Sequence, residues 1–399
     1  MANLFRFLPL LYLLLQAGFA QNNSIVSIPY ALTYLLPSRF NGDISFTFIN
    51  GTHTSDPSVN SLLESATYTP FISYDEEFLS LLGSNPTVEL IDEREANFAA
   101  EAGVWIRERS EVWYTTWIND GPTRVEILNL ADRSIRNLSS SMPLENPNGG
   151  YYHQGLVYFT CLRDDSRGWP GGVVSVDPET GHVERILNSY FGLKFDSIDD
   201  VTWVTQPGTN HSFMFITILP NPEGTEKGEN DTLPQGLWRW DPQAKLLLPA
   251  ISRTELPVAN GVRVSRDQKT LWVTDFGGAE RSRAWGLPAE VGAPAIYKYS
   301  LDEDMWPTNK RIFGVSRMQA ADGIRVDDQG RVWTAEGEGV MVRAADGRVI
   351  GAFNAQYFTR DPTSTAIVQF ALAGDTLVIL GQNKLWTVKL AETVSSRSI

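Results

Sequence analysis

The sequence predicts an all-β protein: a six-bladed β-propeller preceded by an N-terminal extension. Three observations support this fold class, namely the composition, an internal repeat and the spacing of the repeat units. With 399 residues, the chain is long enough for one large closed β-architecture, or for two or three average domains. Its 32 Gly, 22 Pro and 44 aromatic residues (19 Phe, 13 Tyr and 12 Trp) favour short strands joined by tight turns over helices.

The repeat unit opens with a small or acidic residue, continues through an apolar strand and a polar turn, and ends in an aromatic-rich strand. Three copies are clear, a fourth is weaker, and two more are visible only as hairpin-like patterns. In chain order the copies cover residues 101–115, 155–159, 199–216, 260–274, 322–334 and 370–380.

The spacing of these copies decides between two β-architectures. The six units start near residues 101, 155, 199, 260, 322 and 369, which places the starts 44 to 62 residues apart. Four short antiparallel strands need about 40 to 50 residues plus loops, which is the size of one propeller blade. Two β-sandwich domains are the competing interpretation, but they leave the roughly even spacing unexplained.

The N-terminal part of the chain is expected to divide into a leader and an extension. Residues 1–20 have the features of a signal peptide, because Arg6 precedes the apolar run 7–15 and small residues follow it. An uncleaved N-terminal anchor is the alternative. Residues 21–85 lack a clear period, and we expect them to form an extension that packs on a propeller of residues 86–399. No later stretch reaches the roughly 18 apolar residues of a membrane span, so no membrane partner is expected.

Other features of the sequence agree with an extracellular protein. Five N-x-S/T sequons indicate a secreted glycoprotein, although several are expected by chance in this length; they lie at Asn22, Asn50, Asn137, Asn210 and Asn230. Cys161 is the sole cysteine, which excludes an intramolecular disulfide and means that stability must come from a large core.

The charge and the missing motifs exclude several function classes. Acidic residues outnumber basic ones 47 to 33, the net charge is −14, and no Lys/Arg run occurs, so a nucleic-acid partner is not expected. A field of this sign attracts cations. The sequence contains no G-x-S-x-G, Walker or H-E-x-x-H motif, and its four histidines are scattered.

One set of polar residues recurs at the start of the repeats. Glu101, Asp199, Asn260 and Asp322 open four different units. Equivalent positions in a propeller lie at equivalent radius and height, so these side chains are expected to converge on the central channel. Oxygen ligands without His or Cys suit a hard cation. The alternative is that Asp and Asn are merely turn residues preceding strands.

His153 is a further candidate for the site. It lies near the start of the second unit and is expected either to face the channel or to be a hairpin-turn histidine. We include it among the candidate catalytic residues, after Asp322 and Asp199.

Several of these segments resemble signatures of the senescence-marker-protein/gluconolactonase family. Residues 260–275 are similar to its N-G-hydrophobic…S-x-D-x-K-T-L-(Y/W)-V-(T/A)-D signature, and residues 321–333 to its D-G-h-x-h-D-x-x-G-x-h-W signature. Residues 100–105 resemble the opening segment that carries the family's single metal-binding glutamate. The similarity spans about residues 86 to 390. A secretory leader followed by an extension is also the layout of fungal extracellular lactonohydrolases.

The resemblance implies a six-bladed propeller with one divalent ion in its channel, often calcium, and hydrolysis of lactones. Carried over residue by residue, Glu101, Asn260 and Asp322 match the family's metal-binding Glu, Asn and Asp. At the fourth position Asp199 stands where the family usually has Asn, so the ligand set would carry a charge of −3 in place of −2. We expect Ca²⁺ as the cofactor, with Zn²⁺, Mg²⁺ and Mn²⁺ as alternatives.

The expected reaction is attack of water on a small-molecule lactone or ester whose carbonyl group is polarised by the metal. The resemblance favours Asp322 as the general base, with Asp199 second. Two other functions are compatible with the sequence. One is a different propeller enzyme, of the phosphotriesterase-like or strictosidine-synthase-like kind, and the other is a secreted binding propeller that is not an enzyme.

Overall fold

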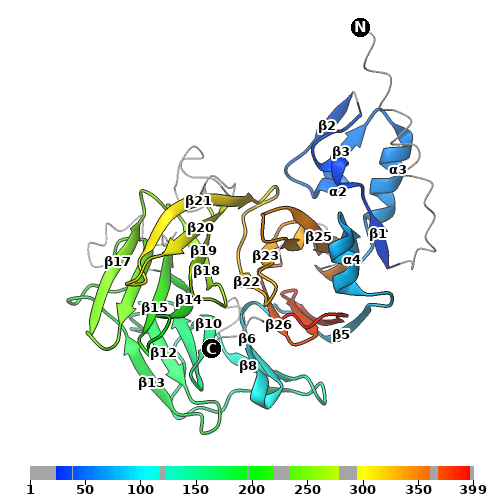
Figure 1. The fold of residues 1–399 in the computed structure, drawn as a ribbon. Coiled ribbons are helices and arrows are strands. Elements are labelled where there is room, and N and C mark those ends of the chain that lie inside the picture. The colour runs from blue at the N-terminus through cyan, green and yellow to red at the C-terminus, as the bar shows by residue number, and fades with distance from the viewer. Residues whose placement is uncertain are drawn as a thin grey trace.

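The computed structural model describes residues 24–37, 39–116, 123–195, 197–219, 233–277, 294–359 and 367–395. Within these ranges, six mainly antiparallel sheets are arranged as blades around one axis, and their innermost strands gather at the centre of Figure 1. The all-β, six-bladed fold predicted from the repeat is therefore confirmed. The expected leader of residues 1–20 and the sequons at Asn22 and Asn230 lie outside the described residues.

Each blade runs outward from the axis through strands that are consecutive in the chain. Blade 1 consists of β6 (Glu101–Ile106), β7 (Glu111–Thr115), β8 (Val125–Asn129) and β9 (Ile135–Asn137), with the short helix η2 (Arg107–Arg109) between β6 and β7. Blade 2 consists of β10 (Pro147–His153), β11 (Leu156–Cys161), β12 (Gly172–Val176) and β13 (Val183–Leu187). Blade 3 consists of β14 (Ser197–Thr205), β15 (Ser212–Leu219), β16 (Gly236–Asp241) and β17 (Leu246–Ser252).

The next two blades follow the same order. Blade 4 consists of β18 (Ala259–Val264), β19 (Thr270–Asp275), β20 (Ala295–Leu301) and β21 (Pro307–Val315). Blade 5 consists of β22 (Ile324–Val326), β23 (Val332–Glu336), β24 (Gly339–Arg343) and β25 (Val349–Asn354), and α5 (Ala355–Thr359) follows it. The innermost strands contact one another in the cyclic order β6, β10, β14, β18, β22 and, in the sixth blade, β26.

The sixth blade closes the ring with strands from both ends of the chain. It combines β26 (Gln369–Ala373), β27 (Thr376–Leu380) and β28 (Lys384–Lys389) with β5 (Thr87–Glu93) as its outermost strand. The antiparallel pairing of β28 with β5 joins the C-terminal part of the fold to the segment that precedes blade 1. This pairing closes the ring.

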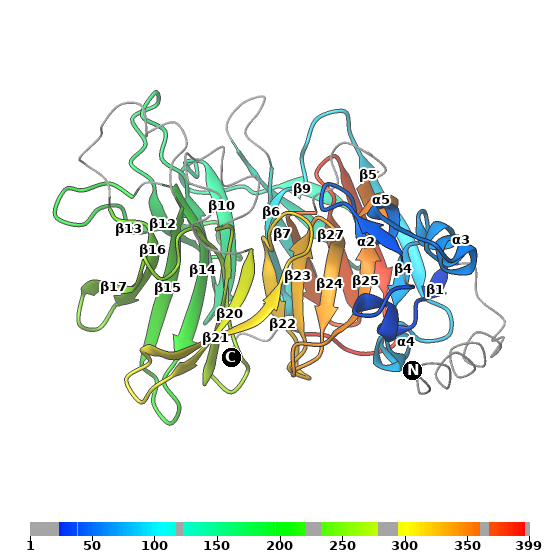
Figure 2. The same ribbon diagram turned by 90° about the horizontal axis from the view of Figure 1, so that it is seen from above.

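Residues before β5 form the extension, which lies on one side of the ring beside β25 (Figure 2). Two of its strands widen blade 5 to six strands, because β4 pairs antiparallel with β25 and parallel with β1. The other elements are helices and a small hairpin. Its elements are β1 (Ile25–Ser27), η1 (Tyr30–Thr33), β2 (Phe40–Gly42), α2 (Phe48–Gly51), β3 (Thr52–Thr54), α3 (Pro57–Ala66), β4 (Phe71–Ser73) and α4 (Glu76–Leu82).

Local sequence explains the two longer helices of the extension. Asp56 caps α3 by accepting a hydrogen bond from the backbone N–H of Ser58, and Asp75 caps α4 by accepting one from Glu77. The core under α4 is aromatic: Phe78 and Phe71 both meet Phe353 of β25 edge-on. The extension is thus part of the hydrophobic core of blade 5.

A second contact joins the extension to blade 5 through a buried carboxylate. Glu338, between β23 and β24, accepts hydrogen bonds from the backbone N–H of Phe48 at 2.8 and 2.9 Å. Arg317 pairs with the same carboxylate at 3.0 Å and also donates to the carbonyl oxygen of Phe46. Burial raises the pKa of Glu338 to about 7.

Four consecutive innermost strands have a β-bulge at the same end. The pairing register shifts between Glu101 and Val104 in β6, and between residues 147 and 150, 198 and 201, and 259 and 262 in β10, β14 and β18. A bulge re-aims the side chains of the residues that it leaves unpaired. These bulges fall at the repeat starts.

The structure corrects one repeat boundary. The second blade begins at Pro147, whereas the sequence pattern placed the unit start at Gly155, which lies in the turn between β10 and β11. The segment Asn148-Gly149-Gly150 resembles a turn but is paired within a strand. Among the described residues, no helix has both the length and the apolar character needed to cross a bilayer.

Candidate metal centre

One polar residue lies at or next to the start of every innermost strand. In β10, β14 and β18 this residue is the first unpaired residue of the bulge, whereas Glu101 is the residue just before its bulge. Three of the six are carboxylates and three are amides. The six residues are Glu101, Asn148, Asp199, Asn260, Asp322 and Gln369.

The three carboxylates are close enough to repel one another. Burial raises the pKa of Glu101 well above its usual range, and the negative charges of Asp322 and Asp199 raise it further. Burial and the charge of Asp322 likewise raise the pKa of Asp199. The structure therefore brings together Glu101, Asp199 and Asp322, which are far apart in the sequence.

Asn260 supplies an oxygen atom to the same region. Its side chain is only 3% exposed, and its Oδ1 atom has no hydrogen-bond partner among the described residues. A buried carbonyl oxygen without a partner is costly, as are buried carboxylates that repel each other. One hard cation would relieve both penalties, because it takes carboxylate and amide oxygens as ligands.

The two other amides contact the carboxylates directly. Asn148 donates from Nδ2 to Oδ1 of Asp199 at 2.9 Å, and Gln369 forms a hydrogen bond with Glu101. Both bonds lower the pKa of the carboxylate that they reach. No group of three or more His, Cys, Asp or Glu side chains in the described ranges is already spaced to hold a metal ion. The argument that these residues bind a metal ion therefore rests on the Oδ1 atom of Asn260, which has no hydrogen-bond partner among the described residues, and on the repulsion between the carboxylates.

The backbone beside Asn260 and Asp322 is held in place by Thr274 and requires a glycine at position 261. Thr274 donates from Oγ1 to the carbonyl oxygen of Asp322 at 3.0 Å and accepts from the N–H of Gly261 at 2.7 Å. A Cβ atom on Gly261 would lie 2.5 Å from the carbonyl oxygen of Asp322. The Asn260-Gly261 pair is thus explained by close approach of two neighbouring blades, and not by a turn.

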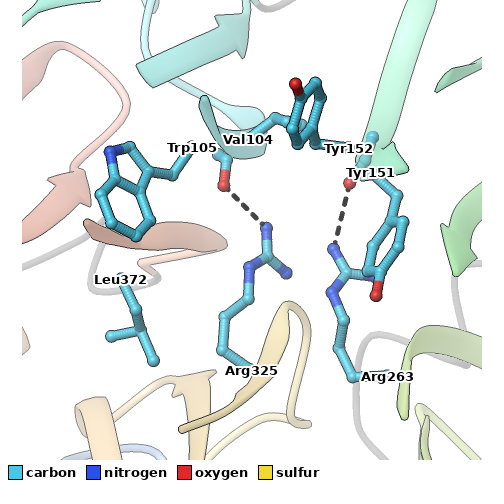
Figure 3. Close-up of a pocket in the computed structure, with 9 residues that line it drawn as sticks. Val104, Trp105, Tyr151, Tyr152, Arg263, Arg325 and Leu372 are labelled. Atoms are coloured by element: carbon cyan, nitrogen blue, oxygen red, sulfur yellow. Dashed lines mark hydrogen bonds between the residues drawn. The ribbon is translucent and has the colours of Figure 1, made fainter. Parts of the chain in front are cut away.

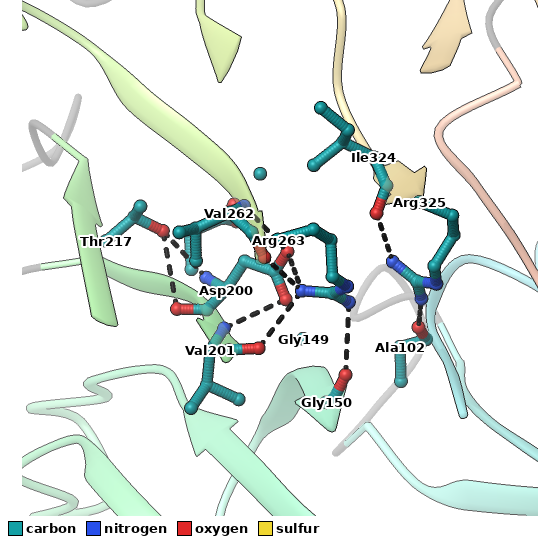
Figure 4. Close-up of polar contacts among 12 residues, drawn as sticks. Ala102, Gly149, Gly150, Asp200, Val201, Thr217, Val262, Arg263, Ile324 and Arg325 are labelled. Carbon is teal, nitrogen blue, oxygen red and sulfur yellow. Dashed lines mark hydrogen bonds and ion pairs between the residues drawn. The ribbon is translucent and has the colours of Figure 1, made fainter. Parts of the chain in front are cut away.

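A second group of charged residues lies further along the innermost strands. Arg263 of β18 pairs with Asp200 of β14 at 2.7 Å, and both side chains are 4% exposed. Arg325 of β22 donates to the carbonyl oxygens of Ala102, Gly103 and Ile324. The two guanidinium groups line a cavity of about 30 Å³ together with Tyr151 and Trp105 (Figure 3). Figure 4 shows how Arg263 and Asp200 connect β10, β14 and β18, and how Arg325 connects β22 with β6.

His153 is not brought to the carboxylates. It is the last residue of β10, five residues after Asn148, and its ring stacks on Trp203 at a centroid distance of 4.9 Å. Five strand residues span on the order of 16 Å. The ring is 3% exposed, and burial lowers its pKa to about 4. Its position fits a packed histidine at a hairpin, which was the alternative to a channel-facing residue.

Sequence reasoning missed four residues of this centre. The sequence Asn148-Gly149-Gly150 favours a turn over residues that line the channel mouth, and Gln369, Arg263 and Arg325 are not marked by the repeat pattern. A signal was available for the arginines, since each stands three residues after a ligand candidate, in the copies that start at Asn260 and Asp322. No comparable signal marks Gln369, because the sixth copy lacks the Asp-Gly or Asn-Gly opening.

The chain is similar to proteins described as lactone hydrolases. Residues 214–377 match the family model described as the SMP-30/Gluconolactonase/LRE-like region. The chain is 24% identical to the lactonohydrolase oryL of Aspergillus oryzae over 368 residues, which cover 86% of this chain and 76% of that protein. It is 24% identical to a gluconolactonase of Zymomonas mobilis over 194 residues, which cover 45% of this chain and 47% of the relative.

Solved structures share the fold at low sequence identity. A gluconolactonase of Xanthomonas campestris is 19% identical with a TM-score of 0.61, and the match covers 80% of this chain and 95% of that one. The calcium-binding protein regucalcin of Agrobacterium tumefaciens is 14% identical with a TM-score of 0.52, covering 78% and 95%. The match to the family model and the similarity to the lactonohydrolase confirm the resemblance that was inferred from the repeat signatures.

Proposed function

Because the chain carries an SMP-30/gluconolactonase/LRE-like region within a six-bladed propeller, we propose that it is a metal-dependent enzyme that hydrolyses lactones in its central channel. The observation that supports this most is the convergence of Glu101, Asp199 and Asp322 beside the unpartnered oxygen of Asn260. The resemblance to lactonohydrolases and gluconolactonases suggests the substrate class.

The proposed metal ligands are Glu101, Asp199, Asn260 and Asp322. An oxygen-only set of this kind suits Ca²⁺ best, with Mg²⁺, Mn²⁺ and Zn²⁺ as alternatives to be tested. A divalent cation bound there would act as a Lewis acid toward the carbonyl oxygen of the lactone. The chain's own contribution is to bring four oxygen-bearing side chains from four blades to one region of the channel.

Asp322 is the proposed general base, which accepts a proton from the attacking water. Its side chain is 8% exposed and lines a cavity of about 10 Å³ with Phe276 and Glu336, which is about the space of one water molecule. Asp199 is the second candidate, and its Oδ1 atom accepts a hydrogen bond from Asn148. That bond stabilises the ionised carboxylate of Asp199 and so reduces its strength as a base.

The experiment that tests the proposal measures proton release from a panel of five- and six-membered lactones. The protein is assayed as purified, after treatment with EDTA, and after addition of Ca²⁺, Mg²⁺, Mn²⁺ or Zn²⁺ in turn. We expect hydrolysis that is lost with the chelator and restored by one or more of the ions. Hydrolysis that persists without metal would contradict metal dependence, and no hydrolysis of any lactone would favour a binding propeller.

The rival propeller enzymes are separated by substrate. A phosphotriesterase-like enzyme would hydrolyse aryl phosphotriesters faster than lactones under the same conditions. A strictosidine-synthase-like enzyme would not need the acidic ligand set, so replacing Glu101 by Gln would leave its activity unchanged. We expect the Glu101→Gln variant to lose both metal binding and lactone hydrolysis.

We further propose that the protein is secreted after cleavage near Gln21. Two of the sequons in the described residues, at Asn137 and Asn210, are exposed, whereas the Nδ2 atom of Asn50 is hydrogen-bonded to Gln356 at 3.1 Å. Mass spectrometry of the protein purified from the culture medium of the organism that produces it should find glycans at Asn137 and Asn210 and none at Asn50. A cell-retained product with an intact Met1 would contradict secretion.

A further inference from the structure

The buried charges along the channel can be summed from the described residues. Three carboxylates, Glu101, Asp199 and Asp322, surround the candidate metal centre. The next charged residues on the same strands are Asp200, Arg263 and Arg325, all 3% exposed. Ions this deeply buried are costly unless an opposite charge lies near them. Each of the six charges therefore requires an explanation.

Asp200 and Arg263 neutralise each other. Oδ2 of Asp200 lies 2.7 Å from Nη1 of Arg263 and also accepts from the N–H of Val262 at 3.1 Å. Nη1 of Arg263 also donates to the carbonyl oxygens of Val201 and Val262, and Nη2 donates to that of Gly150. This pair is electrically neutral and is satisfied without help from the metal centre (Figure 4).

Arg325 has no such partner. It forms no ion pair within the described part of the chain, and its donors reach only main-chain carbonyl oxygens, those of Ala102, Gly103 and Ile324. Two of these oxygens belong to the bulge that directly follows Glu101. Arg325 itself stands three residues after Asp322 on β22. The guanidinium group thus connects the strands that carry two of the proposed ligands.

The charge of Arg325 acts on the metal centre. Burial and the neighbouring Arg263 lower the pKa of Arg325, whereas Asp200 and Glu101 raise it. A guanidinium group keeps its proton in proteins, so the side chain contributes a full positive charge to the channel. The three carboxylates and Arg325 together carry a net charge of −2, which one divalent cation neutralises.

We propose that Arg325 determines the charge selectivity of the metal centre: it offsets one of the three carboxylates, so that the site favours a divalent over a trivalent cation. This inference rests on the proposed metal-dependent function and adds a selectivity residue to it. The role needs no contact between Arg325 and the ion, because the electrostatic field of a buried charge extends over several ångströms with little screening. Arg325 is therefore a positioning and charge-setting residue.

The test compares binding of Ca²⁺ and Tb³⁺ to full-length variants by calorimetry and by competition, with Tb³⁺ luminescence as the second readout. In Arg325→Met we expect the preference for Tb³⁺ over Ca²⁺ to rise about tenfold. A unit charge acting across roughly 10 Å at an effective dielectric constant of about 20 corresponds to at least that factor. Asp199→Asn should shift the preference in the opposite direction. The double variant restores the net charge of −2, and its preference should return close to that of the wild type.

Two further variants keep the test decisive. Arg325→Gln retains an amide donor for the carbonyl oxygen of Ala102 but carries no charge, so it should show the shifted selectivity even if Arg325→Met does not fold. Arg325→Lys keeps the charge and should keep the wild-type selectivity while binding both ions more weakly. Arg331→Met is the matched control, since Arg331 is a buried arginine of the same blade, paired with Asp327 at 2.6 Å in the hairpin after β22. It should lower stability without moving the ion preference.

The outcomes separate this inference from the proposed function. If wild type binds Ca²⁺ and Glu101→Gln does not, but folded Arg325→Gln keeps the wild-type ion preference, the role of Arg325 is wrong and the metal centre stands. If the wild type binds neither ion, the metal centre itself is wrong. A loss of affinity for both ions in equal proportion would show that Arg325 only supports the structure.

Discussion

At the scale of single residues, the carboxylates of this channel differ in what already holds them. Asp199 accepts a hydrogen bond from the amide of Asn148, and Glu101 forms one with Gln369. Asp322 also lines a cavity of about 10 Å³. A carboxylate that is fixed by an amide is suited to hold an ion. One that borders the space for a water molecule is suited to exchange a proton with it.

Replacing Asp322 by Asn tests this difference. The amide keeps the size and one ligand oxygen but cannot act as a base, so the variant should fold and bind metal more weakly. Lactone hydrolysis should fall about 10²- to 10⁴-fold even at saturating metal, which is the usual contribution of a general base. Steady-state rates measured over a metal titration provide the check.

Asp199→Asn is the control for that substitution. It should keep activity and change mainly the metal affinity, because one charge is removed while the amide oxygen remains. Full recovery of Asp322→Asn by added metal would show that Asp322 is only a ligand. An inactive Asp199→Asn beside an active Asp322→Asn would reverse the two roles.

Several of these residues were predictable from the sequence and others were not. Glu101, Asp199, Asn260 and Asp322 could be found because each opens a repeat copy whose period is visible in the sequence. Asn148 could not, since Asn-Gly-Gly has the composition of a turn and only the pairing with β11 shows that it is a strand. Arg325 stands three residues after Asp322, but this spacing alone does not place its side chain, because alternation does not tell which face of a strand points to the channel when both faces are buried.

At the scale of elements, the bulges and the glycines within them set the distance between neighbouring blades. The Cβ positions of Gly149 and Gly261 are blocked by the carbonyl oxygens of Asp199 and Asp322, at 2.4 and 2.5 Å. The innermost strands can approach this closely only where no side chain intervenes. The spacing of the ligand candidates therefore depends on residues that are not ligands.

Gly261→Ala should disturb the metal centre without removing a ligand. The new methyl group must displace the backbone of Asp322, at a cost of about 1 to 3 kcal/mol of unfolding free energy. We expect the Ca²⁺ affinity to fall at least about tenfold, as a loss of 1.4 kcal/mol of binding free energy would produce. Urea unfolding and calorimetry give both values. Gly42→Ala is the control, because nothing lies within 4 Å of its Cβ position; equal effects in both variants would contradict the explanation.

The contact between α2 and blade 5 should make stability depend on pH. The pKa of Glu338 is about 7 in the folded protein, and burial is the main cause. Because this folded value is above the ordinary value of 4.5, the contribution of Glu338 to stability is full below about pH 4.5. It is lost as the pH rises through about 7, and the loss is on the order of 3 kcal/mol.

Glu338→Gln isolates that contribution. Unfolding free energies from urea titrations at pH 5, 6, 7 and 8 should decline less steeply in the variant than in the wild type. The amide still accepts a hydrogen bond from Phe48 and has no proton to lose in this range. Parallel pH profiles for the two proteins would mean that Glu338 is not the titrating group.

At the scale of the whole molecule, the ring is made of blades that each supply one polar residue to a common centre. The repeat spacing was enough to predict six blades, because each unit has the length of four strands. The widening of blade 5 by β1 and β4 was not predictable, since residues 24–82 show no period that links them to residues 349–354.

A ligand bound by four blades should stabilise the entire ring. Saturation with Ca²⁺ at 100 times its dissociation constant adds about 2.7 kcal/mol to the unfolding free energy of the protein that binds it. We expect the Tm of EDTA-treated protein to rise on addition of Ca²⁺, and the Tm of the Glu101→Gln variant to remain unchanged. Calorimetric scans of both proteins provide the measurement, and an equal rise in the variant would place the stabilising ion elsewhere.

The closure of blade 6 has a consequence for biogenesis. β5 leaves the ribosome early, but its partner β28 is among the last strands to be synthesised. For most of translation, then, β5 has an unpaired edge, and the channel with its carboxylates is not yet enclosed. A nascent chain that ends before Lys384 lacks β28, so its sixth blade is incomplete and the edges of β27 and β5 are open to chaperones and to unwanted strand pairing. Synthesis of β28 and its pairing with β5 is thus the step that closes the propeller.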